Sequence, residues 1–302
     1  MTSAHGAHLS DLAGRRMPER VRVALLLAPA LVVVGVFFVG GLAQGVLQSL
    51  GREPFVGEST WSLDAYRSVL TDPAFRASLA ITARVAVLST LIATVLGVGL
   101  ALLVRRVGGR AAMTGLFQST LAIPHLVGAL SIGLLLAPSG LLSRAASSVG
   151  LVDDVQDVPA LTQDAFGWGI IAEYAWKETP FIAVVALAAL SRSVVDLEDV
   201  ARTLGAGPWA RLRSVTLPLL AAPVAAASVL VLAFAAASYE VPRLLGRPFP
   251  ATLPVEAFTR FRDPDLTARP EAMAIATVVA VLTALAAVAY LRLISRLSGR
   301  AL

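Results

Sequence analysis

The sequence predicts an all-α, polytopic membrane protein with about six transmembrane helices. The first observation behind this class is the composition: the 302 residues are 57% hydrophobic and only 15% charged, with a mean hydropathy of +0.76. Soluble domains carry about 25% charged residues, and disordered chains combine low hydrophobicity with a high net charge. The composition therefore excludes both of these classes. The other two observations are long uncharged runs and the arginines that separate them.

Uncharged runs are long enough to cross a bilayer at five places. A hydrocarbon core of about 30 Å requires about 20 apolar residues in a helix. The uncharged runs cover residues 23–51, 85–104, 111–143, 214–239 and 272–291. We expect the corresponding spans at about 23–46, 78–104, 112–137, 215–239 and 272–293.

A sixth span is expected at about 168–190, although it contains Glu173, Lys177 and Glu178. A charge at the centre of a span costs about 2.5–3.5 kcal/mol on insertion scales. These charges lie in the first half of the segment, and Glu173 precedes Lys177 by four residues, which is the favourable order for a helical ion pair. We therefore expect one helix whose charged end faces water or a protein interior.

The orientation follows from the charges between the spans. Arginines dominate the N-terminal segment, the second and fourth connections and the C-terminal tail, whereas the third connection carries several aspartates. Because a basic excess marks the cytoplasmic side, we expect residues 1–20 to form a cytoplasmic tail, residues 21–302 to form the transmembrane domain, and both termini to be cytoplasmic. A signal peptide is the alternative for the first run, but the run is too long and no small-residue cleavage site ends it.

The residues required by common enzymes and nucleic-acid-binding proteins are missing from the sequence. The pI is about 10.4, but the basic residues lie between apolar runs, so no nucleic-acid partner is predicted. The chain has no cysteine, which excludes disulfides and thiolate metal sites. The only lysine, Lys177, precedes Glu178, so there is no P-loop. His5, His8 and His125 are too scattered for a zinc site. We predict no catalytic, cofactor-binding or metal-binding residues.

The fourth connection, residues 191–216, has an unusual pattern. One apolar helical stripe is formed at positions i, i+3, i+4 and i+7 by Leu197, Val200, Ala201 and Leu204. Gly205 permits a sharp turn, and Pro208 can begin a second short helix, on which Trp209 and Leu212 form the apolar side. These residues fit either an amphipathic loop on the lipid surface or an element that docks to another protein, and the pattern by itself does not separate the two.

The same stretch resembles the cytoplasmic EAA loop of permease subunits of binding-protein-dependent ABC importers. That pattern is Glu-Ala-Ala, three residues, Gly, nine residues and an aliphatic-x-Leu-Pro. This sequence has Asp199-Val200-Ala201, then Gly205, and then Val215-Thr216-Leu217-Pro218 at the same spacing. Asp replaces Glu and Val replaces the first Ala, and neighbouring Glu198 is a second acid. The preceding segment 176–181 also resembles these permeases, and the resemblance covers roughly residues 76–297.

The resemblance implies the type I permease fold of ABC importers and a function in ATP-driven import. In this family two permease subunits form the pathway, an extracytoplasmic solute-binding protein delivers the substrate, and a cytoplasmic ABC ATPase dimer binds ATP. The chain itself would therefore be no enzyme, and it would reside in a bacterial inner membrane. The resemblance implies coupling through the 197–218 loop, with the contacts to the ATPase made by Asp199, Ala201, Gly205, Trp209, Leu212 and Pro218.

The substrate is expected to be a small polar solute. Leu204-Gly205-Ala206 resembles the polyamine, thiamine, iron and inorganic-anion branches of the family, and the segment 238–246 most resembles polyamine- and iron-type permeases. Because polar side chains at membrane depth usually face a cavity or a partner, we name as candidates for the substrate pathway His125, Tyr174, Tyr239 and Glu240. Alternatively, the histidine satisfies the carbonyl freed by Pro124, and the two tyrosines are interfacial anchors.

A multi-span membrane chain is also compatible with two other classes of function. An ATP-independent secondary transporter would need no ATPase, but its fold usually has a pair of interrupted segments in matching positions of two halves, and the six expected spans show no such pair. An intramembrane enzyme would need a catalytic constellation, and the sequence offers none.

Overall fold

The computed structural model describes residues 18–298 except 53–59, 108–109, 155–156 and 191. Within these residues every regular element is a helix, which confirms the all-α class. The expected tail, 1–20, lies almost wholly outside the described residues, and the first helix begins at Glu19. Five described helices are long and apolar enough to cross a membrane, and a further pair, bent by 65°, would make six.

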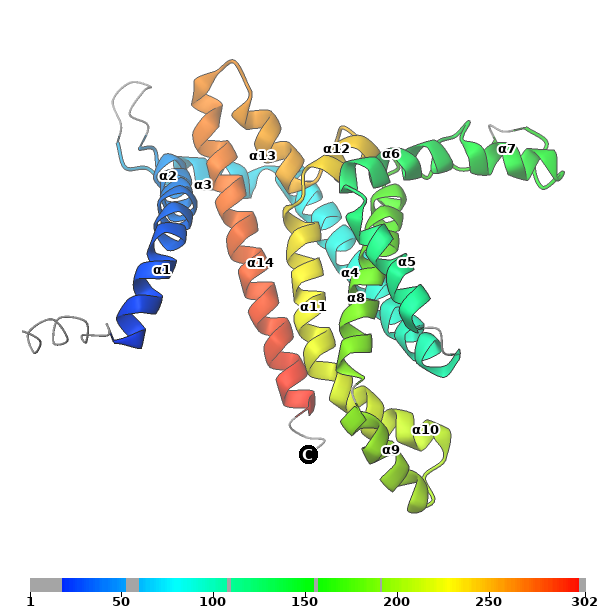
Figure 1. Ribbon diagram of the computed structural model, residues 1–302. Coiled ribbons are helices and arrows are strands. Elements are labelled where there is room, and N and C mark those ends of the chain that lie inside the picture. The colour runs from blue at the N-terminus through cyan, green and yellow to red at the C-terminus, as the bar shows by residue number, and fades with distance from the viewer. Residues whose placement is uncertain (1–17, 53–59, 108–109, 155–156, 191, 299–302) are drawn as a thin grey trace, which may run out of the picture.

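The core is a bundle of four long helices (Figure 1). They are α4 (Pro73–Val107), α8 (Trp168–Ala189), α11 (Leu217–Ala237) and α14 (Arg269–Ser298). The α4 helix packs along α8, and α11 contacts α4, α8 and α14. An added Cβ at Gly97 of α4 would lie 2.6 Å from Ile182 Cβ of α8. The glycine therefore allows the close approach of these two helices, as small residues do between membrane helices.

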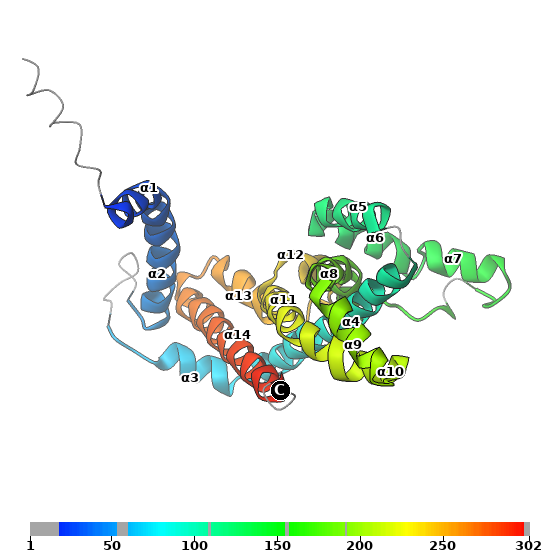
Figure 2. The same ribbon diagram turned by 60° about the horizontal axis from the view of Figure 1, so that its bottom comes forward.

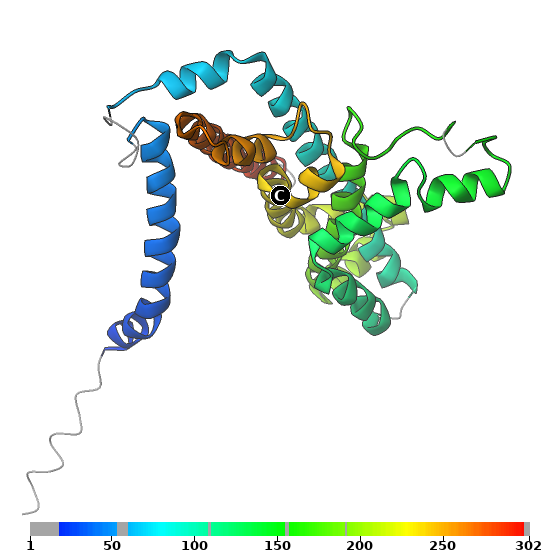
Figure 3. The ribbon, with the colours of Figure 1, turned by 90° about the horizontal axis from the view of Figure 1, so that it is seen from above.

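The N-terminal helix stands apart from the bundle (Figures 2 and 3). It runs through α1 (Glu19–Val34), a π-helical turn (Gly35–Val39) and α2 (Gly40–Ser49), and only α2 packs against α14. None of the residues from Glu19 to Val39 is buried within the chain. An apolar helix of this kind requires lipid or another subunit around it.

The single span expected at 112–137 is wrong, because the structure has two helices there. The α5 helix (Arg110–Ala122) lies along α8, and α6 (His125–Leu136) starts a new direction after Pro124. Proline lacks the N–H that continues the ladder, and it disfavours a helical conformation of the residue before it, Ile123. Figure 1 shows α6 and α7 (Leu141–Ser148) running across one end of the bundle, where α7 reaches outward.

The remaining short helices lie at the two ends of the bundle. At the end that carries α6 are α3 (Asp64–Thr71), α12 (Glu240–Leu245), α13 (Leu253–Phe261) and a 3₁₀ turn (Leu266–Ala268). At the other end are α9 (Arg192–Thr203), α10 (Pro208–Arg211) and a π-helical turn, η3 (Leu212–Thr216), which continues into α11. The start of α1 and the end of α14 also lie at this second end (Figure 1).

Candidate functional site

The α9 helix displays its apolar stripe to the outside. Val194, at its start, is buried, whereas Leu197, Val200 and Leu204 are 48%, 56% and 83% exposed. Asp199, which stands at the acidic position of the loop pattern, is exposed and pairs with Arg202 at 2.9 Å. Ala201 is half-buried, so the described residues cover part of the stripe and leave most of Val200 and Leu204 uncovered.

The turn after α9 is built on Gly205. Its φ is +85°, its N–H bonds to the carbonyl of Arg202 at 3.0 Å, and the N–H of Ala206 bonds to the carbonyl of Ala201 at 2.9 Å. These are the two hydrogen bonds of a Schellman C-cap, which needs a left-handed residue. Among the described residues nothing lies within 4 Å of a Cβ added there. The glycine is therefore required for its backbone conformation rather than for space.

The second short helix begins where the sequence predicts. Pro208 occupies the first turn of α10 after Gly207 as N-cap. Trp209 is 70% exposed, whereas Leu212 is half-buried and lines a 330 Å³ pocket against the end of α4. The two residues therefore do not form one displayed face: Trp209 points outward and Leu212 helps to pack the loop. Pro218 is half-buried at the start of α11.

Glu198 links the loop to α4. Arg105, near the end of α4, donates through Nη1 to Glu198 Oε1 at 3.0 Å and through Nη2 to Oε2, and the Thr216 hydroxyl of η3 donates to Oε1. Partial burial by itself would raise the pKa of Glu198, but these hydrogen bonds and the charges of Arg105 and Arg211 outweigh it, so the pKa is lowered. The sequence offered Glu198 only as a second acid beside Asp199, because Arg105 lies 93 residues away.

A second candidate region lies where α5 breaks from α6. A continuous helix would pair the Thr120 carbonyl with the N–H of residue 124, which is proline. Two other donors reach this carbonyl: the N–H of Ile123 at 3.2 Å and Lys177 of α8, whose Nζ lies 2.7 Å from the Thr120 carbonyl and 3.3 Å from that of Leu121. The alternative in which His125 satisfies the freed carbonyl is therefore wrong. The ammonium turns toward α5, away from the ion pair expected with Glu173.

His125 lies between two carboxylates of α8. Its Nδ1 is 3.3 Å from Glu173 Oε1 and its Nε2 is 3.5 Å from Glu178 Oε1. Glu173 is fully buried and Lys177 is 3% exposed, so the charged part of α8 faces the protein interior, as expected. Among the described residues, Glu173 Oε2 has no hydrogen-bond partner. Tyr174 is also fully buried, with its ring 6.3 Å from that of His125, which removes the interfacial-anchor alternative for this tyrosine.

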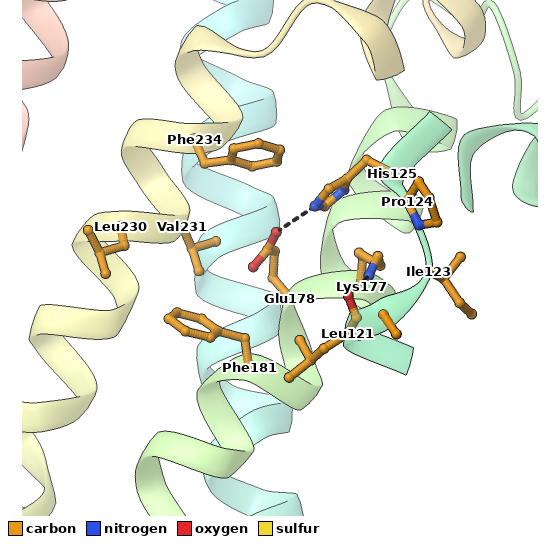
Figure 4. Close-up of a pocket in the computed structure, with 11 residues that line it drawn as sticks. Leu121, Ile123, Pro124, His125, Lys177, Glu178, Phe181, Leu230, Val231 and Phe234 are labelled. Atoms are coloured by element: carbon orange, nitrogen blue, oxygen red, sulfur yellow. Dashed lines mark hydrogen bonds and ion pairs between the residues drawn. The ribbon is translucent and has the colours of Figure 1, made fainter. Parts of the chain in front are cut away.

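A pocket of 420 Å³ opens beside this cluster (Figure 4). It is lined by Leu121, Ala122, Ile123, Pro124, His125, Lys177, Glu178, Phe181, Leu230, Val231 and Phe234. The lining comes from the α5–α6 break, α8 and α11, and the polar groups gather on the side of the break. Sequence reasoning identified His125 here but missed Glu178 and the two phenylalanines, because nothing local distinguishes a pocket-lining phenylalanine from a lipid-facing one.

The other two pathway candidates lie elsewhere. Tyr239 packs against Phe258 with ring centroids 4.6 Å apart and borders a separate, apolar pocket of 430 Å³ between α13 and α14. Glu240 is exposed in the first turn of α12. The four candidates therefore form two groups, and only His125 and Tyr174 are close to each other. In the described part of the chain, no group of three His, Asp or Glu side chains is arranged to hold a metal ion.

The long apolar helices define a multi-pass membrane protein. A family model described as the binding-protein-dependent transport system inner membrane component matches residues 93–300. The chain therefore belongs to this family of ABC importer permease subunits. Permeases of this family have no ATPase site of their own, and membership replaces the secondary-transporter and enzyme alternatives.

Relatives with known roles differ in substrate. The trehalose transport system permease SugA of Mycobacterium tuberculosis is 30% identical over 221 residues, 68% of this chain and 67% of that protein. The trehalose/maltose permease MalF of Thermococcus litoralis is 31% identical over 65% of this chain and 67% of its own. A probable molybdenum permease of Haloferax volcanii is 28% identical over 84% of each chain.

A solved structure shares the fold. A chain of a bacterial ABC transporter that imports the acidic polysaccharide alginate superposes with a TM-score of 0.71 at 22% identity, covering 93% of this chain and 96% of that one. That transporter has also been solved with an alginate-bound periplasmic protein. At this identity the likeness establishes the ABC importer permease fold and not the substrate.

Proposed function

We propose that this permease forms half of the translocation pathway of an ATP-driven importer and that its 197–218 loop docks on a cytoplasmic ABC ATPase. The observation that carries the proposal is the loop itself. It holds Trp209, Val200 and Leu204 outward on a capped turn, at an end of the bundle where the described part of the chain leaves most of their surface uncovered. A large aromatic on a rigid support is the usual form of an interface anchor.

The proposed orientation places α9, α10 and both termini in the cytoplasm of a bacterial inner membrane. The start of α1 and the end of α14 lie at the same end of the bundle as the loop (Figure 1), and basic residues outnumber acidic ones in the segments at that end. The docking proposal requires this orientation, because the ATPase and its ATP are cytoplasmic.

Two further partners belong to the proposal: a second permease subunit and an extracytoplasmic solute-binding protein. The N-terminal helix from Glu19 to Val39 has no buried residue within the chain. It is therefore available to pack against a second permease subunit as well as lipid. The short helices at the end opposite the loop form the surface that a binding protein would meet.

The substrate that best fits the pocket is a neutral hydroxylated solute. Glu178 and His125 offer hydrogen-bond acceptors and donors to hydroxyl groups, and Phe181 and Phe234 offer apolar faces. Trehalose permeases among the relatives agree with this chemistry. A cationic substrate of the polyamine, iron or thiamine type is the second candidate, favoured by the Glu178 carboxylate, which lines the pocket beside Lys177.

The test is Trp209→Ala compared with Trp168→Ala. Trp168 is 46% exposed at the opposite end of α8, so it controls for loss of an exposed tryptophan. Removing an interface anchor costs about 2 kcal/mol or more, roughly thirtyfold in affinity. We expect Trp209→Ala to lose co-purification of the ATPase and transport-linked ATP hydrolysis, while Trp168→Ala keeps both. Full ATPase binding by Trp209→Ala would favour the lipid-surface alternative for the loop.

A further inference from the structure

The loop is tied to the bundle in three ways. Its two chain ends continue into α8 and α11, Val194 and Leu212 pack against the bundle, and the third tie is the carboxylate of Glu198, which receives Arg105 from α4 and Thr216 from η3. We call these three residues the clasp. The side chains of Arg105 and Glu198 are only 22% and 16% exposed. Partly shielded, two-pronged arginine–carboxylate pairs are both stronger and more directional than single exposed ion pairs.

The third tie matters mechanically. A loop held only at its two chain ends can pivot about the line that joins them. A directional contact away from that line removes this rotation, so the loop and the contacted element move together. Here the contacted element is α4, which has 35 residues and packs along α8 and α11.

We propose that the clasp of Arg105, Glu198 and Thr216 is the joint through which ATPase-driven movement of the loop reaches α4. The proposal rests on the proposed function, since it presupposes that the loop docks on an ATPase. It assigns a positioning role: none of the three residues needs to touch the ATPase or the substrate. Trp209 binds the ATPase, and the clasp transmits the movement of the bound loop to α4.

Glu198 stays ionised at physiological pH, which keeps its contacts with Arg105 and Thr216 intact. Its pKa is lowered because the hydrogen bonds from Arg105 and Thr216 and the nearby arginine charges outweigh burial. A carboxyl group with a lowered pKa stabilises the folded arrangement above its ordinary pKa and loses that stabilisation only as the pH falls through the lowered value. The clasp is therefore intact across the physiological pH range.

The experiment measures whether α4 follows the loop, and it needs no knowledge of the substrate. Because the chain has no cysteine, spin labels are introduced as Thr203→Cys on the loop or Val107→Cys at the end of α4, each paired with Arg292→Cys on α14. Distances are measured in the assembled complex with its ATPase, with and without ATP and vanadate. In the otherwise unchanged protein we expect both label pairs to shift on nucleotide trapping.

In Glu198→Ala we expect the distance between the loop label and the α14 label to change on nucleotide trapping as before. The distance between the α4 label and the α14 label should lose most of its change. Thr216→Val, which keeps the ion pair, should reduce the α4 shift less. The charge swap Arg105→Glu with Glu198→Arg should restore it. Asp196→Ala removes an exposed acid of the same helix and should leave both shifts unchanged.

An unchanged α4 shift in Glu198→Ala would overturn the joint and leave the docking proposal intact. Loss of both shifts in Glu198→Ala without recovery in the charge swap would also overturn it, because the residue would then only support the shape of the loop. Failure of the docking proposal has a different signature, namely that the loop pair does not shift even in the unaltered protein.

Discussion

Apolar side chains are usually buried and charged ones exposed. The pocket region and the loop depart from this pattern in opposite ways. Around the α5–α6 break, charged groups are buried, and each of Lys177 and Glu173 finds a partner on another helix of the same chain. In the loop, large apolar groups such as Leu204 and Trp209 are exposed and find none among the described residues. The difference teaches how the two regions are stabilised: apart from Glu173 Oε2, the charged groups of the pocket region have partners within the chain, whereas the exposed side chains of the loop agree with the proposal that another molecule binds them.

The largest effect on stability is expected in the pocket region, at Lys177. Lys177→Met removes the ammonium that lies 2.7 Å from the Thr120 carbonyl and 3.3 Å from the Leu121 carbonyl at the α5–α6 break. Hydrogen bonds to a charged group contribute about 1.5–3 kcal/mol. We expect a clearly lower melting temperature of the purified complex. Lys177→Arg keeps donors near the carbonyls and should lose less. Equal melting of Lys177→Met and the unaltered protein would show that the ammonium does not support the break.

The next effect separates backbone conformation from size in the loop. Gly205→Val places a β-branched residue at φ +85°, which costs about 1–3 kcal/mol of local strain. Gly207 has equally open surroundings, but its φ of −68° is a conformation that any residue adopts. We expect Gly205→Val to insert into the membrane normally but to bind the ATPase poorly, and Gly207→Val to behave as the unaltered protein does. Co-purification of the ATPase measures both variants, and identical results for the two would contradict the C-cap argument.

The smallest effect is expected at an acid outside both regions. Glu240 is exposed at the start of α12, where its carboxylate interacts favourably with the helix dipole by about 0.5 kcal/mol. Glu178 lines the pocket. Uptake of radiolabelled trehalose, or of spermidine for the second substrate candidate, is expected to fall at least tenfold in Glu178→Gln and to change less than about twofold in Glu240→Gln. A larger loss in Glu240→Gln would move the pathway toward α12.

Features with local causes follow from the sequence. The span expected at 168–190 matches α8 (Trp168–Ala189), and the turn at Gly205 and the helix start at Pro208 lie where expected. An apolar period, a proline or a left-handed glycine acts within one or two turns of the chain, so neighbouring residues suffice to predict it. Pro124 carried such a signal as well, but the length of the uncharged run around it favoured a single span.

Features that join distant helices were decided by the tertiary structure. Arg105 meets Glu198 across 93 residues and Lys177 reaches Thr120 across 57, whereas Tyr239 and His125 border different pockets. The sequence by itself determined the apolar helices and the glycine turn of the loop, because burial in lipid and backbone turns depend on composition and local order. Which side chains share a pocket or a joint depends on how the helices pack, and that packing is a property of the whole bundle.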